Sequence, residues 1–102
     1  VCEGLAFGEA LGLDPESLVP TLAAGAAGNW FLDKRGATMM AQSYVPGFKS
    51  ALLLKDLHIV QAMAEALGKE YSVVGQSLRD YQALVDAGFG EEDTSALIRL
   101  KR

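Results

Sequence analysis

Lys55 and Asp56 place a cation beside a carboxylate within the longest helical pattern of the sequence, about residues 49–67. On a helical wheel of about 100° per residue, Asp56 falls in the middle of the apolar arc, between Met63 and Leu67, and Lys55 falls at its border. A carboxylate in an apolar environment is costly unless it is paired or hydrogen-bonded. Asp56 therefore either makes a buried structural hydrogen bond or ion pair, or belongs to a cleft lined by the start of this helix.

The same wheel predicts which side of this helix is buried. The apolar side holds Leu53, Leu57, Val60, Ala64 and Leu67, extended by Ile59 and Met63. The opposite side holds His58, Gln61 and Glu65, which we expect to face solvent. Apolar residues cover more than half of the circumference, which is wide for a helix that faces one core, so self-association is predicted.

Two glycine pairs could be mistaken for phosphate-binding loops. No strand pattern precedes Gly25-Ala-Ala-Gly28, and three acidic residues follow Gly88-Phe-Gly90. A helix junction and a C-terminal helix turn are therefore the better interpretations. Cys2 is the one cysteine, which excludes an internal disulfide and a multi-cysteine metal site, and no metal site is predicted.

Composition indicates one globular domain of 102 residues, with 50% hydrophobic and 22% charged residues. The net charge of −4 argues against a nucleic-acid partner, which requires a dense cationic face. The longest uncharged stretch, residues 17–32, contains proline and glycine and is too short for a transmembrane helix, so no membrane partner is expected. No signal-peptide pattern opens the chain, and we expect a cytoplasmic protein.

The periodicity is helical throughout, and no run of alternating β-branched residues predicts a strand. Helices are expected over about residues 3–11, 15–24, 29–36, a short segment through Met39 and Met40, 49–67, 74–87 and 91–100. Gly12 and Gly68 are natural helix ends, Asp14 is a natural N-cap before Pro15, and Pro46 breaks the chain between helices. The sequence therefore predicts an all-α, compact multi-helix domain with one long central helix.

The first helical pattern is already under way at Glu3, and no capping residue precedes it. A helix start usually carries Ser, Thr, Asp or Asn. We therefore expect the chain to be a fragment whose first helix has been cut.

The order of several short motifs resembles the C-terminal domain of the β-hydroxyacid dehydrogenases. That family includes 3-hydroxyisobutyrate dehydrogenase and tartronate semialdehyde reductase and is related to 6-phosphogluconate dehydrogenase. The central motifs are Pro46-Gly47-Phe48 and Leu54-Lys55-Asp56-Leu57. The resemblance extends over the chain through Glu3 to Leu11, Gly12-Leu-Asp-Pro15, Gly25-Ala-Ala-Gly-Asn-Trp30 and Asp93-Thr-Ser-Ala-Leu97.

The resemblance implies a two-domain enzyme in which an N-terminal Rossmann domain binds NAD or NADP. Residues 1–102 would then be the C-terminal helical domain, which closes the cleft over a small hydroxyacid and contributes to a homodimer. Lys55 would reach the cofactor near its nicotinamide, and Phe48 and Asp56 would line or support the substrate pocket. The dinucleotide fingerprint Gly-x-Gly-x-x-Gly and the catalytic Lys-x-x-Asn-Asn motif are not found in these residues. No catalytic residue is therefore assigned here, and the isolated chain is predicted to be inactive.

A free-standing all-α interaction module without catalysis is the alternative. Composition does not separate the two, because apolar helix faces bind partners as readily as they build cores. The interrupted first helix and the position of Asp56 favour the enzyme fragment. A Rossmann fingerprint and the lysine motif in the upstream coding sequence would decide between them.

Overall fold

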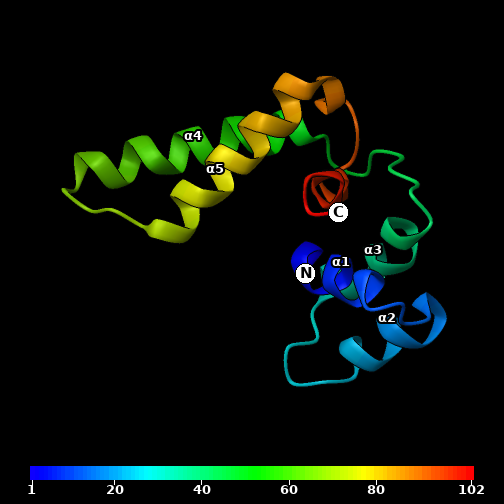
Figure 1. The fold of residues 1–102 in the computed structure, drawn as a ribbon. Coiled ribbons are helices and arrows are strands. Elements are labelled where there is room, and N and C mark those ends of the chain that lie inside the picture. The colour runs from blue at the N-terminus through cyan, green and yellow to red at the C-terminus, as the bar shows by residue number, and fades with distance from the viewer. The chain divides into compact units, whose positions relative to one another are not determined.

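The computed structural model describes residues 1–102, and its secondary structure is helical, which confirms the all-α class (Figure 1). The elements are α1 (Cys2–Ala10), α2 (Pro15–Ala23), α3 (Trp30–Met40), α4 (Ser50–Ala66), α5 (Ser72–Leu84), a π-helical turn (Val85–Phe89) and a 3₁₀ helix (Thr94–Leu100). None of these helices has both the length and the apolar character needed to cross a bilayer. The chain forms two compact units, described in turn: residues 1–44 with 98–102, and residues 45–97.

Local capping residues set the helix boundaries in the first unit, and of these Gly12 and Asp14 were predicted as such. Gly12, after α1, has a φ of +75°, a conformation that glycine adopts without strain. The carboxylate of Asp14 accepts a hydrogen bond from the amide of Glu16 at 3.2 Å, and Pro15 is the first residue of α2. Asn29 caps α3 by accepting from the amide of Leu32 at 2.9 Å. Each cap was predictable because it is local in sequence.

The expected helix end near Gly36 is wrong, because α3 continues without interruption to Met40 and there is no separate helix through Met39 and Met40. Gly36 is buried against α2, where a β-carbon on it would lie 2.6 Å from a methyl of Val19. The glycine therefore permits the close approach of two helices and does not end one.

Replacing Gly36 by alanine should destabilise the chain by about 1–2 kcal/mol, because the overpacking cost exceeds the gain in helix propensity. Val19 is β-branched and buried, so its side chain has few alternative rotamers. The matched control is Gly4→Ala in α1, where an added β-carbon meets nothing within 4 Å. Urea unfolding should show Gly4→Ala at or above wild-type stability, and equal effects for the two variants would contradict the packing role of Gly36.

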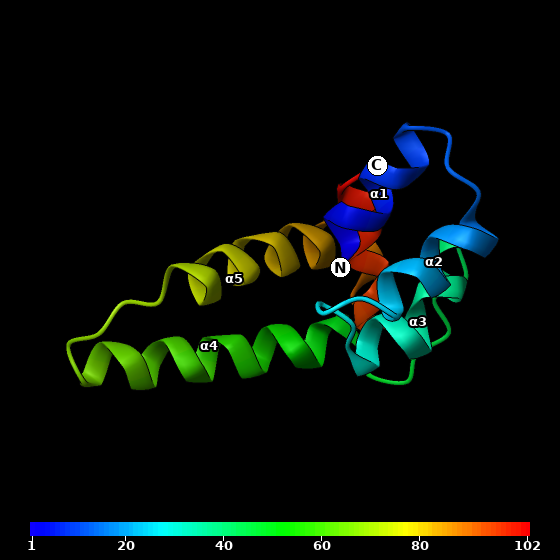
Figure 2. The same cartoon turned by 90° about the horizontal axis from the view of Figure 1, so that it is seen from below.

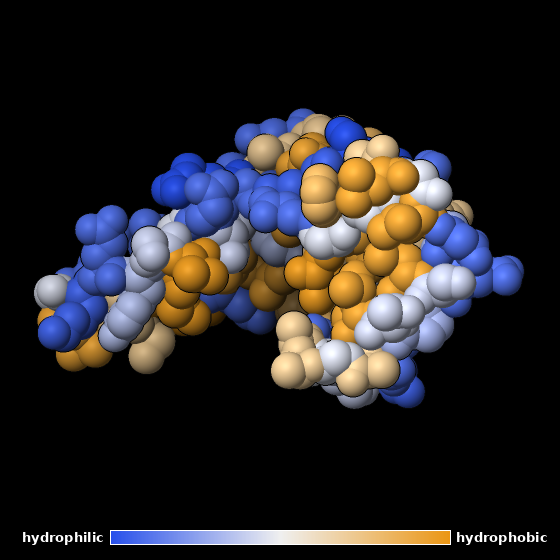
Figure 3. Space-filling view, turned by 60° about the horizontal axis from the view of Figure 1, so that its bottom comes forward, coloured by the Kyte–Doolittle hydropathy of each residue, from blue (hydrophilic) through white to orange (hydrophobic).

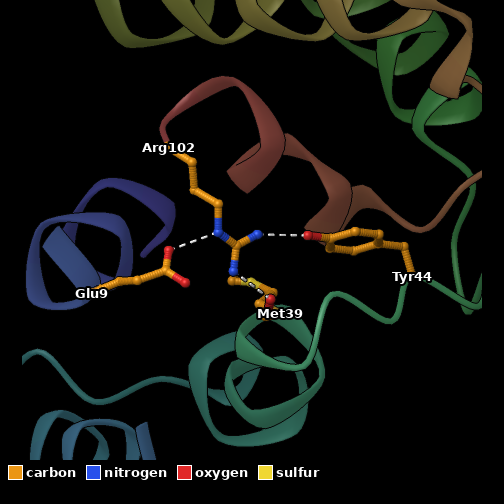
Figure 4. A network of polar contacts seen from close by, with 4 residues as sticks. All are labelled: Glu9, Met39, Tyr44 and Arg102. Atoms are coloured by element: carbon orange, nitrogen blue, oxygen red, sulfur yellow. Dashed lines mark hydrogen bonds and ion pairs between the residues drawn. The ribbon is translucent and has the colours of Figure 1, made fainter. Parts of the chain in front are cut away.

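The C-terminal residues of the first unit are held by a polar network around Arg102 (Figure 4). Its guanidinium donates to the Glu9 carboxylate at 2.7 Å, the Tyr44 hydroxyl at 2.8 Å and the Met39 carbonyl at 2.9 Å. Burial opposes the charge, but the bonds to Glu9 and Tyr44 outweigh it and raise the pKa of Arg102. The guanidinium of Arg99 lies 4.4 Å from the centre of the Tyr44 ring, a cation–π distance.

In the second unit, α4 and α5 lie side by side as an antiparallel pair (Figure 2). The predicted buried side of α4 is confirmed at Leu53, Leu57 and Ala64, which are buried or partly buried. It is wrong at its other four residues, Ile59, Val60, Met63 and Leu67, which are exposed. The buried or partly buried residues of α4 are Ser50, Ala51, Leu53, Leu54, Leu57, Gln61 and Ala64. The exposed apolar residues are Leu52, Ile59, Val60, Met63 and Leu67. Periodicity located the wide apolar arc, but the line of contact with α5 lies at one border of it and includes Gln61, which was expected on the solvent side.

The helix predicted over residues 74–87 begins at Ser72, two residues earlier. Its predicted end at Gly88 is confirmed, because Gly88 has a φ of +96°, the left-handed conformation that ends a helix. The last helix is a 3₁₀ helix that begins at Thr94, whereas it was expected to begin at Glu91. The residues between these two helices instead pair with the start of α4, and a single antiparallel bridge joins Lys49 and Asp93.

Candidate functional site

The start of α4 is held by backbone carbonyls from the segment that precedes the 3₁₀ helix. The amide of Ser50 donates to the Glu92 carbonyl at 2.8 Å, and the amide of Ala51 donates to the Gly90 carbonyl at 2.9 Å. Lys49, at the N-cap position, makes no capping bond with its side chain. The first amides of α4 are therefore already bonded, so this helix start is not a preformed anion site.

Asp93 organises the turn before α4. Its side chain is buried, with 1% of the residue exposed. One carboxylate oxygen accepts from the amides of Gly47 and Phe48 at 3.0 and 3.1 Å. The other accepts from the amide of Ser95 at 3.0 Å and from its hydroxyl at 2.5 Å. These bonds tie residues 47–48 to residues 93–95.

The pKa of Asp93 reflects two opposed effects. Burial raises it, but the bonds from Ser95, Phe48 and Gly47 favour the charged form more strongly and hold the pKa below its usual value. The sequence predicted Asp93 only as one of three acidic residues at the start of the last helix, and not as a residue that holds the turn before α4. The available signal was the Asp-x-Ser spacing of residues 93–95, which is typical of an aspartate that bonds to the backbone two residues on.

The three residues singled out by the family resemblance lie on the segment that Asp93 holds. Phe48 is in the turn before α4 and is 41% exposed, and Lys55 and Asp56 are in the second turn of the helix. The Lys55 ammonium lies 3.3 Å from the Asp56 carboxylate, and their side chains are 63% and 49% exposed. Asp56 lies within the apolar arc of the helix, as predicted, but the expectation that it is enclosed there is wrong. Its side chain is about half exposed because the apolar residues around it are themselves exposed.

An exposed ion pair of this kind contributes less than about 1 kcal/mol to stability. Both groups keep most of their hydrogen-bonding capacity for a ligand. An exposed ring, a cation and a carboxylate thus lie along residues 48–56, and these are side-chain types that can bind a small polar molecule with an apolar edge.

The other candidates are placed elsewhere. Cys2 is partly buried, and burial raises the pKa of its thiol, which makes it a poor nucleophile at neutral pH. A hollow of about 530 Å³ lies at the far end of the α4–α5 pair and is lined by Glu65, Lys69, Glu70 and Arg79 among others. It includes none of Phe48, Lys55 and Asp56.

Comparisons with known proteins match nearly the whole chain. The family model described as NAD-binding of NADP-dependent 3-hydroxyisobutyrate dehydrogenase matches residues 1–101. An uncharacterized oxidoreductase of Synechocystis is 32% identical over 98% of this chain and 34% of its own length. The 2-hydroxy-3-oxopropionate reductase of Escherichia coli is 30% identical over 97% of this chain and 34% of its own length. The chain spans about a third of the length of these relatives.

A solved structure shares the fold. The 3-hydroxyisobutyrate dehydrogenase of Salmonella typhimurium superposes with a TM-score of 0.91 at 24% identity, covering 97% of this chain and 35% of that protein. The relatives are oxidoreductases by name, and the family match is nearly complete. The chain belongs to the NAD-binding family of 3-hydroxyisobutyrate dehydrogenase.

Proposed function

We propose that residues 1–102 form the C-terminal helical domain of a cytoplasmic NAD(P)-dependent hydroxyacid dehydrogenase and close its active-site cleft. The observation that carries this proposal is the exposure of Phe48, Lys55 and Asp56 on a turn and helix start whose backbone is fixed by Asp93. The family match and the reductase and dehydrogenase names of the relatives support it.

Lys55 suits the cofactor side of such a cleft. Its ammonium is exposed, and its partner Asp56 is also exposed, so the ion pair can exchange for another contact at little cost. A lysine cation donates charge-assisted hydrogen bonds to ribose and phosphate oxygens and provides positive charge near an anionic substrate. The nicotinamide, when bound, supplies the hydride acceptor or donor. Lys55 therefore binds and orients the cofactor and the substrate, and it takes no part in the chemical step.

Phe48 and Asp56 suit the substrate side. The half-exposed ring of Phe48 offers an apolar wall for the carbon skeleton of a small hydroxyacid. The Asp56 carboxylate accepts hydrogen bonds from hydroxyl groups, and its neighbour Lys55 offsets its repulsion of an anionic substrate. These three side chains form one wall of the site, and the catalytic lysine is assigned to the sequence upstream.

The isolated 102-residue chain should show no hydride transfer, because the cofactor domain and the catalytic lysine are needed together with this wall. The measurement is the change in NADH or NADPH absorbance with a panel of small hydroxyacids. The control is the same chain joined to its natural upstream sequence, which should turn over at least one of them. Turnover by the isolated chain above a heat-denatured blank would contradict the proposal.

We also propose that the protein forms a homodimer, with the exposed apolar side of α4 as a contact. Figure 3 shows hydrophobic side chains at the surface of the α4–α5 pair, between hydrophilic ones. Sedimentation of the chain at high micromolar concentration should show a dimer, and Met63→Glu should weaken it because Met63 is one of the most exposed of these residues. His58→Glu, on the other side of α4, is the matched control. A monomer under these conditions contradicts the assignment.

A further inference from the structure

We infer that Asp93 is a positioning residue for the proposed active-site wall of Phe48, Lys55 and Asp56. Its carboxylate holds the backbone amides of Gly47 and Phe48, directly before the helix that contains Lys55. The inference rests on the proposed function of that wall. It adds a residue that lies far away in sequence and that neither touches a ligand nor reaches the surface.

The first observation is that hydrogen bonds to residues 93–94 hold the backbone of Phe48. Phe48 is 41% exposed, so packing encloses it only in part and its position depends also on its backbone. A single oxygen of Asp93 accepts both consecutive amides, those of Gly47 and Phe48. The Phe48 carbonyl in turn accepts from the amide of Thr94 at 2.9 Å. Both sides of the Phe48 residue are thus bonded to residues 93–94.

The second observation is that the same segment sets the start of α4. The hydroxyl of Ser50 donates to the Asp93 carbonyl at 3.1 Å, in a buried position. The amides of Ser50 and Ala51 bond to the carbonyls of Glu92 and Gly90. Lys55 follows one turn later, so any shift of this helix start moves its ammonium as well. A displacement of about 1 Å at a reacting centre can lower turnover about a hundredfold.

The two carboxylate oxygens of Asp93 provide a matched pair of variants. Asp93→Asn keeps the shape but replaces one acceptor oxygen by an amide NH2 donor, which conflicts with the amides of residues 47, 48 or 95. Ser95→Ala is equally buried and removes one bond to the other oxygen, leaving the two amides of the Phe48 turn bonded. Both variants should lower the melting temperature, so stability alone does not distinguish them.

Kinetics and amide exchange of the full-length enzyme do distinguish them. Per folded molecule, Asp93→Asn should lower kcat/KM about tenfold or more, with a higher KM for the hydroxyacid, whereas Ser95→Ala should change it less than about twofold. Hydrogen exchange of peptides covering residues 45–49 should accelerate in Asp93→Asn and stay near wild type in Ser95→Ala. If Asp93→Asn does not fold, Asp93→Glu replaces it under the same criteria, because it keeps the charge and moves the oxygens by one methylene.

Phe48→Ala and Lys55→Ala, measured in parallel, separate the failure of this inference from that of the proposed function. If these two lower kcat/KM while Asp93→Asn matches Ser95→Ala in kinetics and exchange, Asp93 is only structural and the inference is overturned alone. If neither Phe48→Ala nor Lys55→Ala changes kcat/KM, the proposed function fails and the inference falls with it, whatever Asp93→Asn does.

Discussion

Lys55→Ala in the full-length enzyme should lower kcat/KM about ten- to hundredfold, which corresponds to the loss of a charge-assisted hydrogen bond worth about 1.5–3 kcal/mol. The melting temperature should remain near that of the wild type, because the Lys55 side chain is 63% exposed and pairs with an exposed neighbour, Asp56. Steady-state kinetics and thermal unfolding of the same preparations measure kcat/KM and the melting temperature.

Lys34→Ala is the matched control for this experiment. Lys34 also lies within a helix, and its ammonium is 3.0 Å from the carboxylate of the adjacent Asp33, with both side chains exposed. It should leave both kcat/KM and the melting temperature unchanged. Asp56→Ala should likewise leave stability unchanged, since the structure shows its carboxylate exposed. Full activity in Lys55→Ala would show that the family role does not extend to this residue.

The largest loss of stability should come from Asp93→Ala, about 3–5 kcal/mol in the free energy of unfolding, because three amides lose a buried acceptor. Urea unfolding at neutral pH and fixed protein concentration measures this loss. Ser95→Ala, which removes one donor to the same carboxylate, should cost clearly less. Equal losses in the two variants would show that the amides of residues 47 and 48 find other acceptors.

The pH dependence of this loss has a definite sign. Hydrogen bonds hold the folded-state pKa of Asp93 below its unfolded value near 3.8, so folding favours the ionised form. Its contribution is present above the unfolded pKa and is lost as the pH falls through the folded pKa. The stability difference between wild type and Asp93→Ala should therefore narrow below about pH 4 and be constant near neutrality. A difference that stays constant into strong acid would show that the carboxylate charge has no part in it.

Local signals in the sequence predicted the elements of this fold well. Gly12, Asp14 and Asn29 act on backbone groups within a few residues, and each does in the structure what its type predicts. The errors came from contacts between distant residues. Glycine is typical of a helix end, but Gly36 instead leaves room for the side chain of Val19 from another helix. No local rule contains that information.

The candidate site shows the same division. Helical periodicity singled out Asp56 because it placed the residue in an apolar arc, but a wheel gives the width of an arc and not which border meets a neighbouring helix. Phe48 and Lys55 came from the family resemblance, and their roles remain predictions. The Asp-x-Ser spacing could have indicated the local bonds of Asp93 but not its bonds to Gly47 and Phe48, which are 46 and 45 residues away in the chain.

The first unit is discontinuous in the chain, and this sets an order for its assembly during synthesis. Ile98 is fully buried and Arg102 joins Glu9, Met39 and Tyr44, yet both residues follow the whole of residues 45–97. The ribosome therefore synthesises every residue of the second unit before it synthesises the last residues of the first unit. Bringing such distant segments together adds loop-closure entropy and slows folding. Nascent chains that lack residues 98–102 expose an unfinished core to chaperones and proteases, whereas the inserted α4–α5 unit already contains all of its own residues.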